Sequence, residues 1–416
     1  METPRVTPPM PDEKIPVAKP VRKEPTLSKA PPAGRKFPCP QCGARLDFDP
    51  AARGLSCPYC GHREDVTADA SGEVLERDYA KYLDGDRAFQ ARGLIDGRSS
   101  QTRCTGCGAM VLLEDKVATE ECPFCHTHLE NKPESAEDAI APESLLPFQL
   151  ELRAARDKFT HWLEGLWFAP SELKIIANLG QLTGVYLPYW TYDSMTYTHY
   201  DGRRGDNYQE IESYTVTTSD GSTERRTRTI TLIRWCNVSG EVQHFFDDVL
   251  VCASVGLPAE LVVALEPWDL LKLEPFQASF LSGFRAERYA TGLKDGFTEA
   301  KQLIEPVVVG LVHRDIGGDH QRIDDKKTRY SAITFKHCLL PVWVAVYRYR
   351  DRTFQILLNG TTGKVVGKRP WSGLKIARLV LAILLAVGLV AFLVWHFSKP
   401  SQAAGPQNSA PARVRR

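Results

Sequence analysis

The fold of the N-terminal region is decided by the stretch Cys39-Pro-Gln-Cys42, which is followed after fourteen residues by Cys57-Pro-Tyr-Cys60. Sixty-five positions further on, the same spacing returns as Cys104-Thr-Gly-Cys107 and Cys122-Pro-Phe-Cys125. The dipeptide Gly-Ala follows the second cysteine of both copies. Similarity of this kind at a fixed offset indicates an internal repeat of one small structural unit.

Each copy offers four cysteines as two close pairs, which is the ligand set of a tetrahedral zinc ion. A redox-active Cys-X-X-Cys pair and a disulfide framework are the alternatives, and two identical four-cysteine spacings argue against both. We therefore expect two zinc ribbons, each holding one structural Zn²⁺. Gly43, Gly61 and Gly108 supply the permissive backbone after the second cysteine of such a knuckle, and His126 takes this position in the fourth. The predicted metal ligands are Cys39, Cys42, Cys57, Cys60, Cys104, Cys107, Cys122 and Cys125.

The composition sets broad limits on the kind of protein. The chain has 416 residues and a formal net charge of +1, so its overall charge points to no polyanionic partner. At about 150 residues per domain, this length suggests two or three domains. Thiolate metal sites beside the scattered Cys236, Cys252 and Cys338 fit a reducing cytosol. The N-terminal residues contain no apolar segment of the kind found in a cleavable signal peptide.

Changes of composition along the chain predict its domain organisation. The N-terminal tail is rich in proline and poor in large apolar side chains, so burial could not offset the entropy lost on ordering it. The spacer between the ribbons has a short apolar stripe at helical spacing, and we expect it to pack on the ribbons. The predicted segments are a disordered Pro-rich tail (1–36), zinc ribbon 1 (37–66), a helical spacer (67–100), zinc ribbon 2 (101–130), a linker (131–144), an α+β domain (145–370), a transmembrane helix (374–398) and a disordered tail (399–416).

The predicted fold class is therefore small β for the two tandem four-cysteine zinc ribbons, followed by an α+β domain with a mostly antiparallel sheet. This domain opens with an amphipathic helix between Leu152 and Leu166, where apolar residues recur at helical spacing. Two strand-like runs, 214–218 and 227–235, flank the turn Ser219-Asp-Gly-Ser222 and predict a hairpin. Further strands are expected at 185–192, 342–349, 353–358 and 364–366, and a helix near 296–304.

A membrane segment follows the large domain. From Ile376 to Phe397 only Arg378 and His396 are polar, and the run is long enough to cross a bilayer. A buried helix of a soluble domain is the alternative, but it does not account for apolar residues on every face. Lys and Arg are more frequent before this run than directly after it, which favours cytoplasmic N-terminal domains. We expect a single-pass protein of the cell inner membrane, with the lipid bilayer as one partner.

Two polar clusters outside the ribbons are candidates for chemistry. His313, Asp315, Asp319 and His320 could surround a metal or serve acid–base roles, or they could form a polar hairpin tip built on Gly317-Gly318. Asp247-Asp248 is a carboxylate pair for which the sequence gives no partner. The string Gly360-Thr-Thr-Gly-Lys364 lacks the spacing of a phosphate-binding loop, so a helicase motor is not expected. We predict neither catalytic nor organic cofactor-binding residues, and no enzyme.

Three tryptophans lie in strand-like runs of the large domain: Trp190, Trp235 and Trp343. Aromatic residues in strands pack against cross-strand neighbours, so we expect these indoles mainly in the core. The alternative is an aromatic ligand pocket, for which Asp193 and His337 would be the nearest polar groups in the sequence.

Neither ribbon presents the clustered cations that nucleic-acid binding requires. Acidic residues outnumber basic ones in the second ribbon, and the arginines of the first ribbon are matched by carboxylates. Nucleic acid is therefore an improbable partner, and the ribbons are expected to contact protein or to be purely structural.

Five strings outside the ribbons carry a resemblance to known proteins: Leu146-Pro-Phe148, Trp167-Phe-Ala-Pro170, Gly184-Val-Tyr-Leu-Pro-Tyr-Trp-Thr-Tyr-Asp193, Phe335-Lys-His-Cys-Leu-Leu-Pro-Val-Trp343 and Asn359-Gly-Thr-Thr-Gly-Lys364. With these strings, the whole chain resembles a family of bacterial double zinc-ribbon, single-pass membrane proteins. Such proteins are often labelled primosomal protein N′ (replication factor Y) or superfamily II helicase, and related zinc-ribbon membrane proteins resemble parts of phage-shock-type stress systems. The resemblance implies cytoplasmic protein partners of the PspA-like or SPFH kind.

Together these observations predict a membrane-anchored, zinc-binding adaptor that recruits cytoplasmic proteins, in the setting of an envelope-stress response. The alternative is a nucleic-acid-associated zinc-ribbon protein, as the helicase label would imply. Salt-dependent DNA binding distinguishes the two, because phosphate contacts weaken steeply with salt.

Overall fold

The computed structural model describes residues 37–66, 74, 76–83, 100–113, 119–130, 140–168, 182–217, 219–349, 352–368 and 372–397. The fold of these residues is mostly β, with antiparallel sheets and an apolar C-terminal helix. The two predicted tails, most of the predicted spacer and most of the predicted linker lie outside the described residues.

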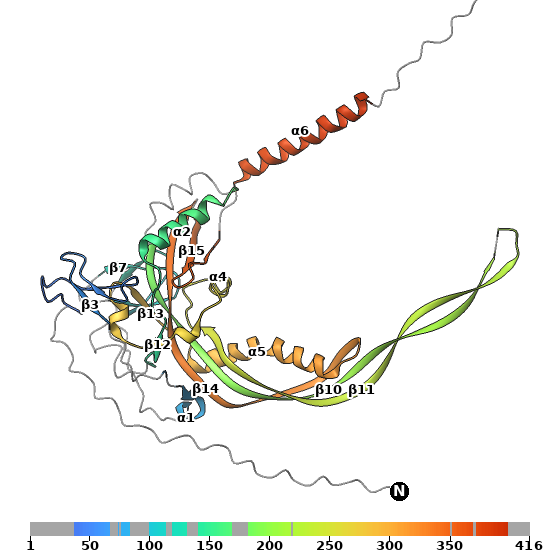
Figure 1. Ribbon diagram of the computed structural model, residues 1–416, viewed down its shortest axis with the longest axis horizontal. Coiled ribbons are helices and arrows are strands. Elements are labelled where there is room, and N and C mark those ends of the chain that lie inside the picture. Colours follow the sequence, from blue (N-terminus) through green and yellow to red (C-terminus); the bar gives the residue numbers. More distant parts are fainter. Residues whose placement is uncertain are drawn as a thin grey trace, which may run out of the picture.

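Three long antiparallel strands form the central sheet. They are β10 (Leu182–Thr217), β11 (Thr223–Cys252) and β14 (His320–Tyr349). β14 accompanies β10 only as far as the pair Gly205 and His320, whereas β11 continues to the pair Thr217 and Thr223. The distal half of the β10–β11 hairpin therefore extends from the body as a curved two-stranded arm (Figure 1).

Helix α5 (Leu293–Ile316) lies along one face of these strands (Figure 1). Its buried residues recur every three or four positions, so a single apolar stripe faces the sheet. They are Leu293, Gly296, Phe297, Ala300, Ile304, Val308, Val312 and Ile316. Gly296 permits the close approach, since a Cβ there would lie 2.5 Å from the Tyr192 hydroxyl and 2.9 Å from the Trp190 ring.

Shorter strands widen the sheet at the end remote from the arm. β14 also pairs with β15, and β15 with β16. β13 joins β10 to the second cysteine-rich unit through β6. The bounds are β4 (Arg77–Asp78), β5 (Ser100–Arg103), β6 (Met110–Leu113), β9 (Ser144–Leu145), β12 (Glu274–Pro275), β13 (Arg285–Arg288), β15 (Arg352–Asn359) and β16 (Val365–Gly367).

The two cysteine-rich units pack on opposite faces of this end of the sheet. Alternate residues of a strand point to opposite faces. On β14, Trp343 belongs to the core cluster that includes Phe48 of the first unit, while Val342 and Val344 belong to the cluster that includes Phe124 of the second. Because both faces of β14 are covered here, the sequence at 339–346 is apolar almost without interruption. The second unit joins the large sheet through β5 and β6, whereas the first unit keeps its own three-stranded sheet and packs on a face of the large one.

The smaller elements complete these two layers. α2 (Leu152–Glu164) shares the core cluster of the first unit, and α4 (Ala259–Ala264) shares that of the second. The other elements are α1 (Tyr79–Leu83), β1 (Asp47–Asp49), β2 (Gly54–Ser56), β3 (Arg63–Asp65), β7 (Thr119–Glu121), β8 (His128–Glu130), η2 (Leu270–Lys272) and η3 (Ala278–Leu281).

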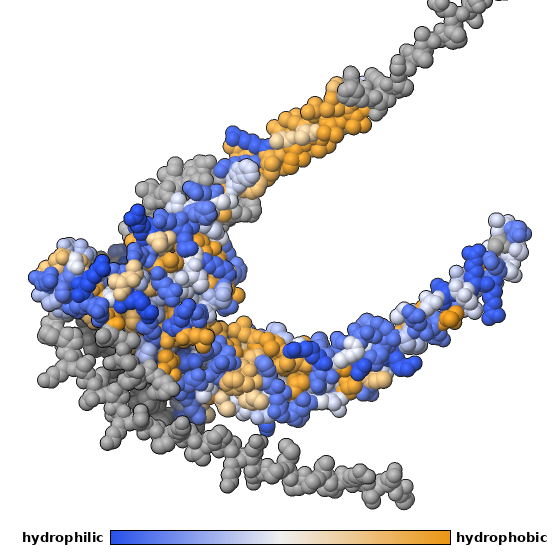
Figure 2. All heavy atoms as spheres, viewed as in Figure 1, coloured by the Kyte–Doolittle hydropathy of each residue, from blue (hydrophilic) through white to orange (hydrophobic). Residues whose placement is uncertain are grey.

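Helix α6 (Gly373–Phe397) projects from the body and is apolar over its visible surface (Figures 1 and 2). Residues Gly373–Trp395 have a mean hydropathy of 2.8, and none of the segment is buried inside the molecule. A helix of this length and composition is a candidate membrane span. It coincides closely with the predicted transmembrane segment.

Several predicted elements are confirmed. The helix after 152, the hairpin around 219–222, the pairing of 342–349 with 353–358 and the short strand after Asn359-Gly360 are all present. The helix predicted near 296–304 is longer, because its apolar stripe continues to Ile316. The run 185–192 and the described part of the run 214–218, which ends at Thr217, belong to one strand, β10, since the polar residues between them continue the same strand.

The expectation that the spacer packs on the ribbons is wrong for the residues that the structure describes. β4 pairs with β14 of the large sheet, and Tyr79 of α1 packs against the rings of Phe297, Phe335 and Tyr192. The apolar stripe of this segment therefore contributes to the core beneath α5 and not to the cysteine-rich units.

Candidate metal centres

All four Cys-X-X-Cys segments form the same backbone turn. In the first, the Gly43 N–H donates to the Cys39 carbonyl over 2.8 Å, and the Cys39 N–H donates to the Ala44 carbonyl. Equivalent pairs of bonds begin at Cys57, Cys104 and Cys122. The residue after the second cysteine has a positive φ in every turn. These residues are Gly43 (70°), Gly61 (75°), Gly108 (80°) and His126 (58°), so the predicted knuckle positions are confirmed, including the non-glycine one.

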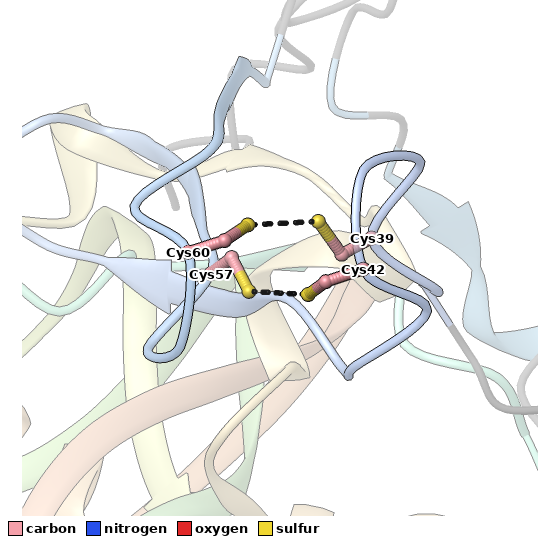
Figure 3. Close-up of side chains that lie close together, drawn as sticks. All are labelled: Cys39, Cys42, Cys57 and Cys60. Atoms are coloured by element: carbon pink, nitrogen blue, oxygen red, sulfur yellow. Dashed lines mark hydrogen bonds between the residues drawn. The ribbon is translucent and has the colours of Figure 1, made fainter.

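The turns bring the eight predicted ligands into two groups of four. Within each group, one ligand atom from every cysteine lies within 4.8 Å of the others. In the first group, the sulfurs of Cys39 and Cys60 are 3.5 Å apart, as are those of Cys42 and Cys57 (Figure 3). In the second group, the corresponding separations are 3.5 Å for Cys104 with Cys125 and 3.6 Å for Cys107 with Cys122.

These distances suit a metal ion and not a disulfide. Bonded sulfurs lie about 2.05 Å apart, and all eleven cysteines of the chain are free. Four sulfurs at about 2.3 Å from a tetrahedral zinc ion would be separated by about 3.8 Å. The observed separations are close to this value, so each group could hold a metal ion through four thiolates.

One cysteine of each group is predisposed to ionise. The pKa of Cys57 is lowered to about 6, chiefly because the backbone N–H of Cys60 points at its sulfur. The pKa of Cys107 is lowered to about 5, chiefly through its hydrogen bond with Cys122. Each group therefore has one thiolate available near neutral pH, and the thiolate is the form that binds metal. Desolvation raises the pKa of Cys60 to about 12 and also raises that of Cys125, so these thiols would release their protons only on binding a metal ion.

The two centres differ in how deeply they are buried. In the second, Phe124 lies between Cys122 and Cys125 and is fully buried, in contact with Gly256, where a Cβ would lie 3.2 Å from the phenyl ring. In the first, the matched residue Tyr59 is 83% exposed. The second centre is therefore part of the core, whereas the first presents its outer knuckle to solvent.

Polar contacts attach each centre to the body. The Ser282 hydroxyl donates to the Leu46 carbonyl over 2.5 Å, and the Phe48 N–H donates to the Ser282 carbonyl over 2.9 Å. The Phe48 and Phe280 rings meet edge to face at 5.0 Å. For the second centre, the Gln355 side-chain amide donates to the Phe124 carbonyl.

The residues His313, Asp315, Asp319 and His320 do not converge on one point. His313 and Asp315 belong to the last turn of α5, and Gly317 and Gly318 end that helix with φ values of 65° and 73°. Asp315 accepts a bond from the Tyr200 hydroxyl, while Asp319 accepts one from the Asn207 N–H. This segment is a helix-to-strand connection, so its expected hairpin tip is wrong.

Asp248 has partners that the sequence did not reveal. A bulge in β10 at Asp193 lets the Asp193 carboxylate accept the Asp248 N–H over 2.7 Å. Asp193, Asp247 and Asp248 offer oxygens within 4.8 Å of one another. The Lys336 ammonium lies 2.7 Å from Asp248. Its positive charge balances these carboxylates in the way that a bound metal ion would.

The same ammonium links this cluster to the segment before α1. Lys336 is also 3.1 Å from the carboxylate of Glu76. The Thr334 hydroxyl lies 3.0 Å from Glu76 and 3.1 Å from Asp193, so its single proton can be donated to either carboxylate. Burial raises the pKa of Asp193 to about 6. These residues come from distant parts of the chain, and the only hint in the sequence is a lysine within the buried run after Phe335.

The tryptophans divide into two groups. Trp190 and Trp343 are buried, as expected for core residues. Trp235 is 45% exposed on the arm, so the core prediction is wrong for it. The Trp190 ring lies 4.8 Å from that of His337, a buried histidine whose pKa is lowered to about 4 by desolvation. His337 contacts Trp190, but Asp193 belongs to the separate Lys336 cluster, so these two groups do not form one pocket.

Comparison with known proteins gives one informative relative. The chain is 26% identical over 262 residues to "Uncharacterized protein YdjG" of Bacillus subtilis (strain 168), which covers 61% of this chain and 72% of that protein. No protein-family model matches the chain, and no solved structure matches it.

Proposed function

We propose that this protein is a membrane-anchored zinc-binding adaptor that recruits cytoplasmic proteins through its first four-cysteine unit. The observation that carries the proposal is the contrast between Tyr59 and Phe124, which occupy equivalent positions in the two units. The buried Phe124 secures its unit to the sheet. The exposed Tyr59 contributes nothing comparable to the core, and it presents an aromatic ring of the kind that anchors protein interfaces.

Zinc is the metal that best suits both centres. Four sulfur ligands in a tetrahedral arrangement with no open position are typical of structural zinc sites. Each unit has only short strands and few apolar residues of its own, so bound metal would stabilise it in the way that zinc stabilises other small modules. The rigid knuckle would then fix the backbone on both sides of Tyr59.

Helix α6 supplies the proposed anchor. Its surface is exposed and, after Arg378, apolar as far as Trp395, which is costly in water and favourable in lipid. The excess of Lys and Arg before the helix favours a cytoplasmic position for the body, in the inner membrane. Thiolate centres are also better suited to that reducing side. PspA-like or SPFH proteins are the partners that the family resemblance implies, in an envelope-stress setting.

The test is capture by the full-length protein solubilised in detergent. A partner captured by the wild type should be lost with Tyr59→Ser, while Trp167→Ser provides a matched control because Trp167 is 84% exposed on a different element. Equal capture by both variants would contradict the role of the first unit. Retention of DNA that falls steeply with salt would instead support a nucleic-acid-associated function.

A further inference from the structure

The arm is defined as residues 205–217 of β10 and 223–235 of β11. Asp319 and His320 hydrogen-bond Asn207 at its base, and no other described element of this chain packs on the arm beyond that point. β14 begins at His320, opposite Gly205, and α5 ends at Ile316. Both strands nevertheless continue for twelve more paired positions. An isolated two-stranded ribbon is only marginally stable in water, because neither face is covered.

One face of the arm has its polar groups satisfied internally. Arg228 lies 2.7 Å from Glu212 on the opposite strand and 5.6 Å from the centre of the Tyr214 ring. Arg234 lies 4.9 Å from the centre of the Tyr208 ring. This charged face continues the side of the sheet that α5 covers, since Tyr200 and the even-numbered positions of β10 before it point toward that helix.

The opposite face carries no charge over its central part. β10 contributes Gly205, Asn207, Gln209, Ile211 and Ser213. β11 contributes their direct partners Trp235, Ile233, Thr231, Thr229 and Thr227. We call these ten residues the uncharged face.

The largest apolar side chains of the uncharged face point into solvent. Ile211 is 72% exposed, Trp235 is 45% exposed and Ile233 is 40% exposed. A Cβ at Gly205 would come within 2.8 Å of Ile233 and 3.1 Å of the Trp235 ring, so glycine lets these two side chains lie across the neighbouring strand. The result is a surface of apolar, hydroxyl and amide groups on one side of a twisted ribbon (Figure 1).

We propose that the uncharged face packs against the same face of a second copy of this chain, so that two arms form a four-stranded sandwich. Hydroxyl and amide side chains both donate and accept hydrogen bonds, so like groups can pair across a two-fold axis. Because the face has no charge, two copies meet without like-charge repulsion. Two such ribbons have the geometry of sheets packed face to face. Nucleic acid or an acidic lipid surface would require clustered cations, and this side of the arm carries only Arg225, opposite Thr215 and beyond the ten residues of the uncharged face.

The first test measures the mass of the full-length protein in detergent. The wild type should be dimeric, and Ile211→Arg should weaken dimerisation on the order of a hundredfold, because two buried like charges would face each other across the axis. Glu210→Arg is the matched control, since it places the same side chain at the adjacent exposed position on the charged face. It should remain dimeric. A monomeric wild type, or equal loss in both variants, would overturn the proposal.

A second measurement does not depend on a disruptive variant. Nitroxide labels at Thr229→Cys or Glu210→Cys, in a Cys236→Ser background that removes an exposed thiol, report which face approaches another copy in liposomes. Labels at 229 should show strong dipolar coupling, since packed sheets lie about 10 Å apart, and labels at 210 should show much weaker coupling. Labels at 229 with lipid-like oxygen accessibility and no coupling would assign the face to the membrane and overturn the proposal.

Discussion

Tyr59 and Phe124 occupy the same position in two matched cysteine knuckles, yet Tyr59 is 83% exposed and Phe124 is fully buried. The knuckle backbones are alike, with equivalent pairs of hydrogen bonds and a residue of positive φ after the second cysteine, Gly61 in one and His126 in the other. The difference therefore arises from where each unit sits on the sheet. In the second unit, Phe124 packs in the core, whereas Tyr59 of the first unit points into solvent.

This contrast predicts opposite effects on stability. Phe124→Ala should lower the free energy of unfolding by about 3–5 kcal/mol, because it removes a buried ring and leaves a cavity. Tyr59→Ala should change it by less than about 0.5 kcal/mol, as exposed substitutions usually do. Thermal or denaturant unfolding of the full-length variants in detergent checks both values, and equal losses would contradict the different placement of the two units.

Substitutions of Trp190 and Trp167 should also differ in their effect on the free energy of unfolding. Trp190 is completely buried and its indole N–H donates to the Thr291 carbonyl over 2.9 Å, so Trp190→Ala should cost about 3–5 kcal/mol. Trp167→Ala should be nearly neutral because its side chain is 84% exposed. The same unfolding measurement applies. A stable Trp190→Ala protein would argue that this indole lines a ligand site and does not support the core.

Glu143 predicts a specific dependence of stability on pH. It is buried beside Arg77 at 2.5 Å, and desolvation raises its pKa from about 4.5 to about 7. The folded state therefore binds a proton more tightly than the unfolded state. Stability should fall as the pH rises from about 4.5 to about 7, by an amount on the order of 3 kcal/mol from this group.

Glu143→Gln should remove most of that slope, because the amide mimics the protonated carboxyl. The exposed Glu210→Gln is the control and should leave the slope unchanged. Unfolding free energies measured at several pH values between about 4.5 and about 7.5 make the comparison. Identical slopes in the wild type and Glu143→Gln would show that this carboxyl does not titrate in the proposed window.

The proposed orientation predicts which thiols an impermeant reagent reaches in intact cells. Cys236 is exposed on β11 of the body and should be protected in intact cells and labelled only after lysis. Ser401→Cys, placed after α6 in a Cys236→Ser background, should be labelled in intact cells. The reverse pattern would invert the topology.

The metal ligands could be predicted from the sequence because they depend on local spacing. Two cysteines in one knuckle are held by hydrogen bonds across a few residues, and a repeated gap of fourteen residues brings the pairs together. The same holds for the hairpin around Asp220 and for the apolar C-terminal helix, which are visible as patterns in one stretch of chain.

The remaining features depend on contacts between distant segments. The cluster of Glu76, Asp193 and Lys336 joins three parts of the chain, and no spacing indicates that they meet. The full length of β10 could not be predicted either, because glycines such as Gly202 and Gly205 are typical of turns. At both positions a Cβ would lie within 3.0 Å of neighbouring atoms, so close packing and not a turn requires glycine there.

The central claim is that both four-cysteine groups are structural metal centres, and the metal content of the full-length protein tests it most directly. We expect two zinc ions per chain in the wild type and one in Cys42→Ser. Cys122→Ser should also lose one ion and should be the less stable variant, because its centre lies in the core. One zinc ion or none in the wild type, or thiol titration that reveals disulfides within either group, would contradict the account.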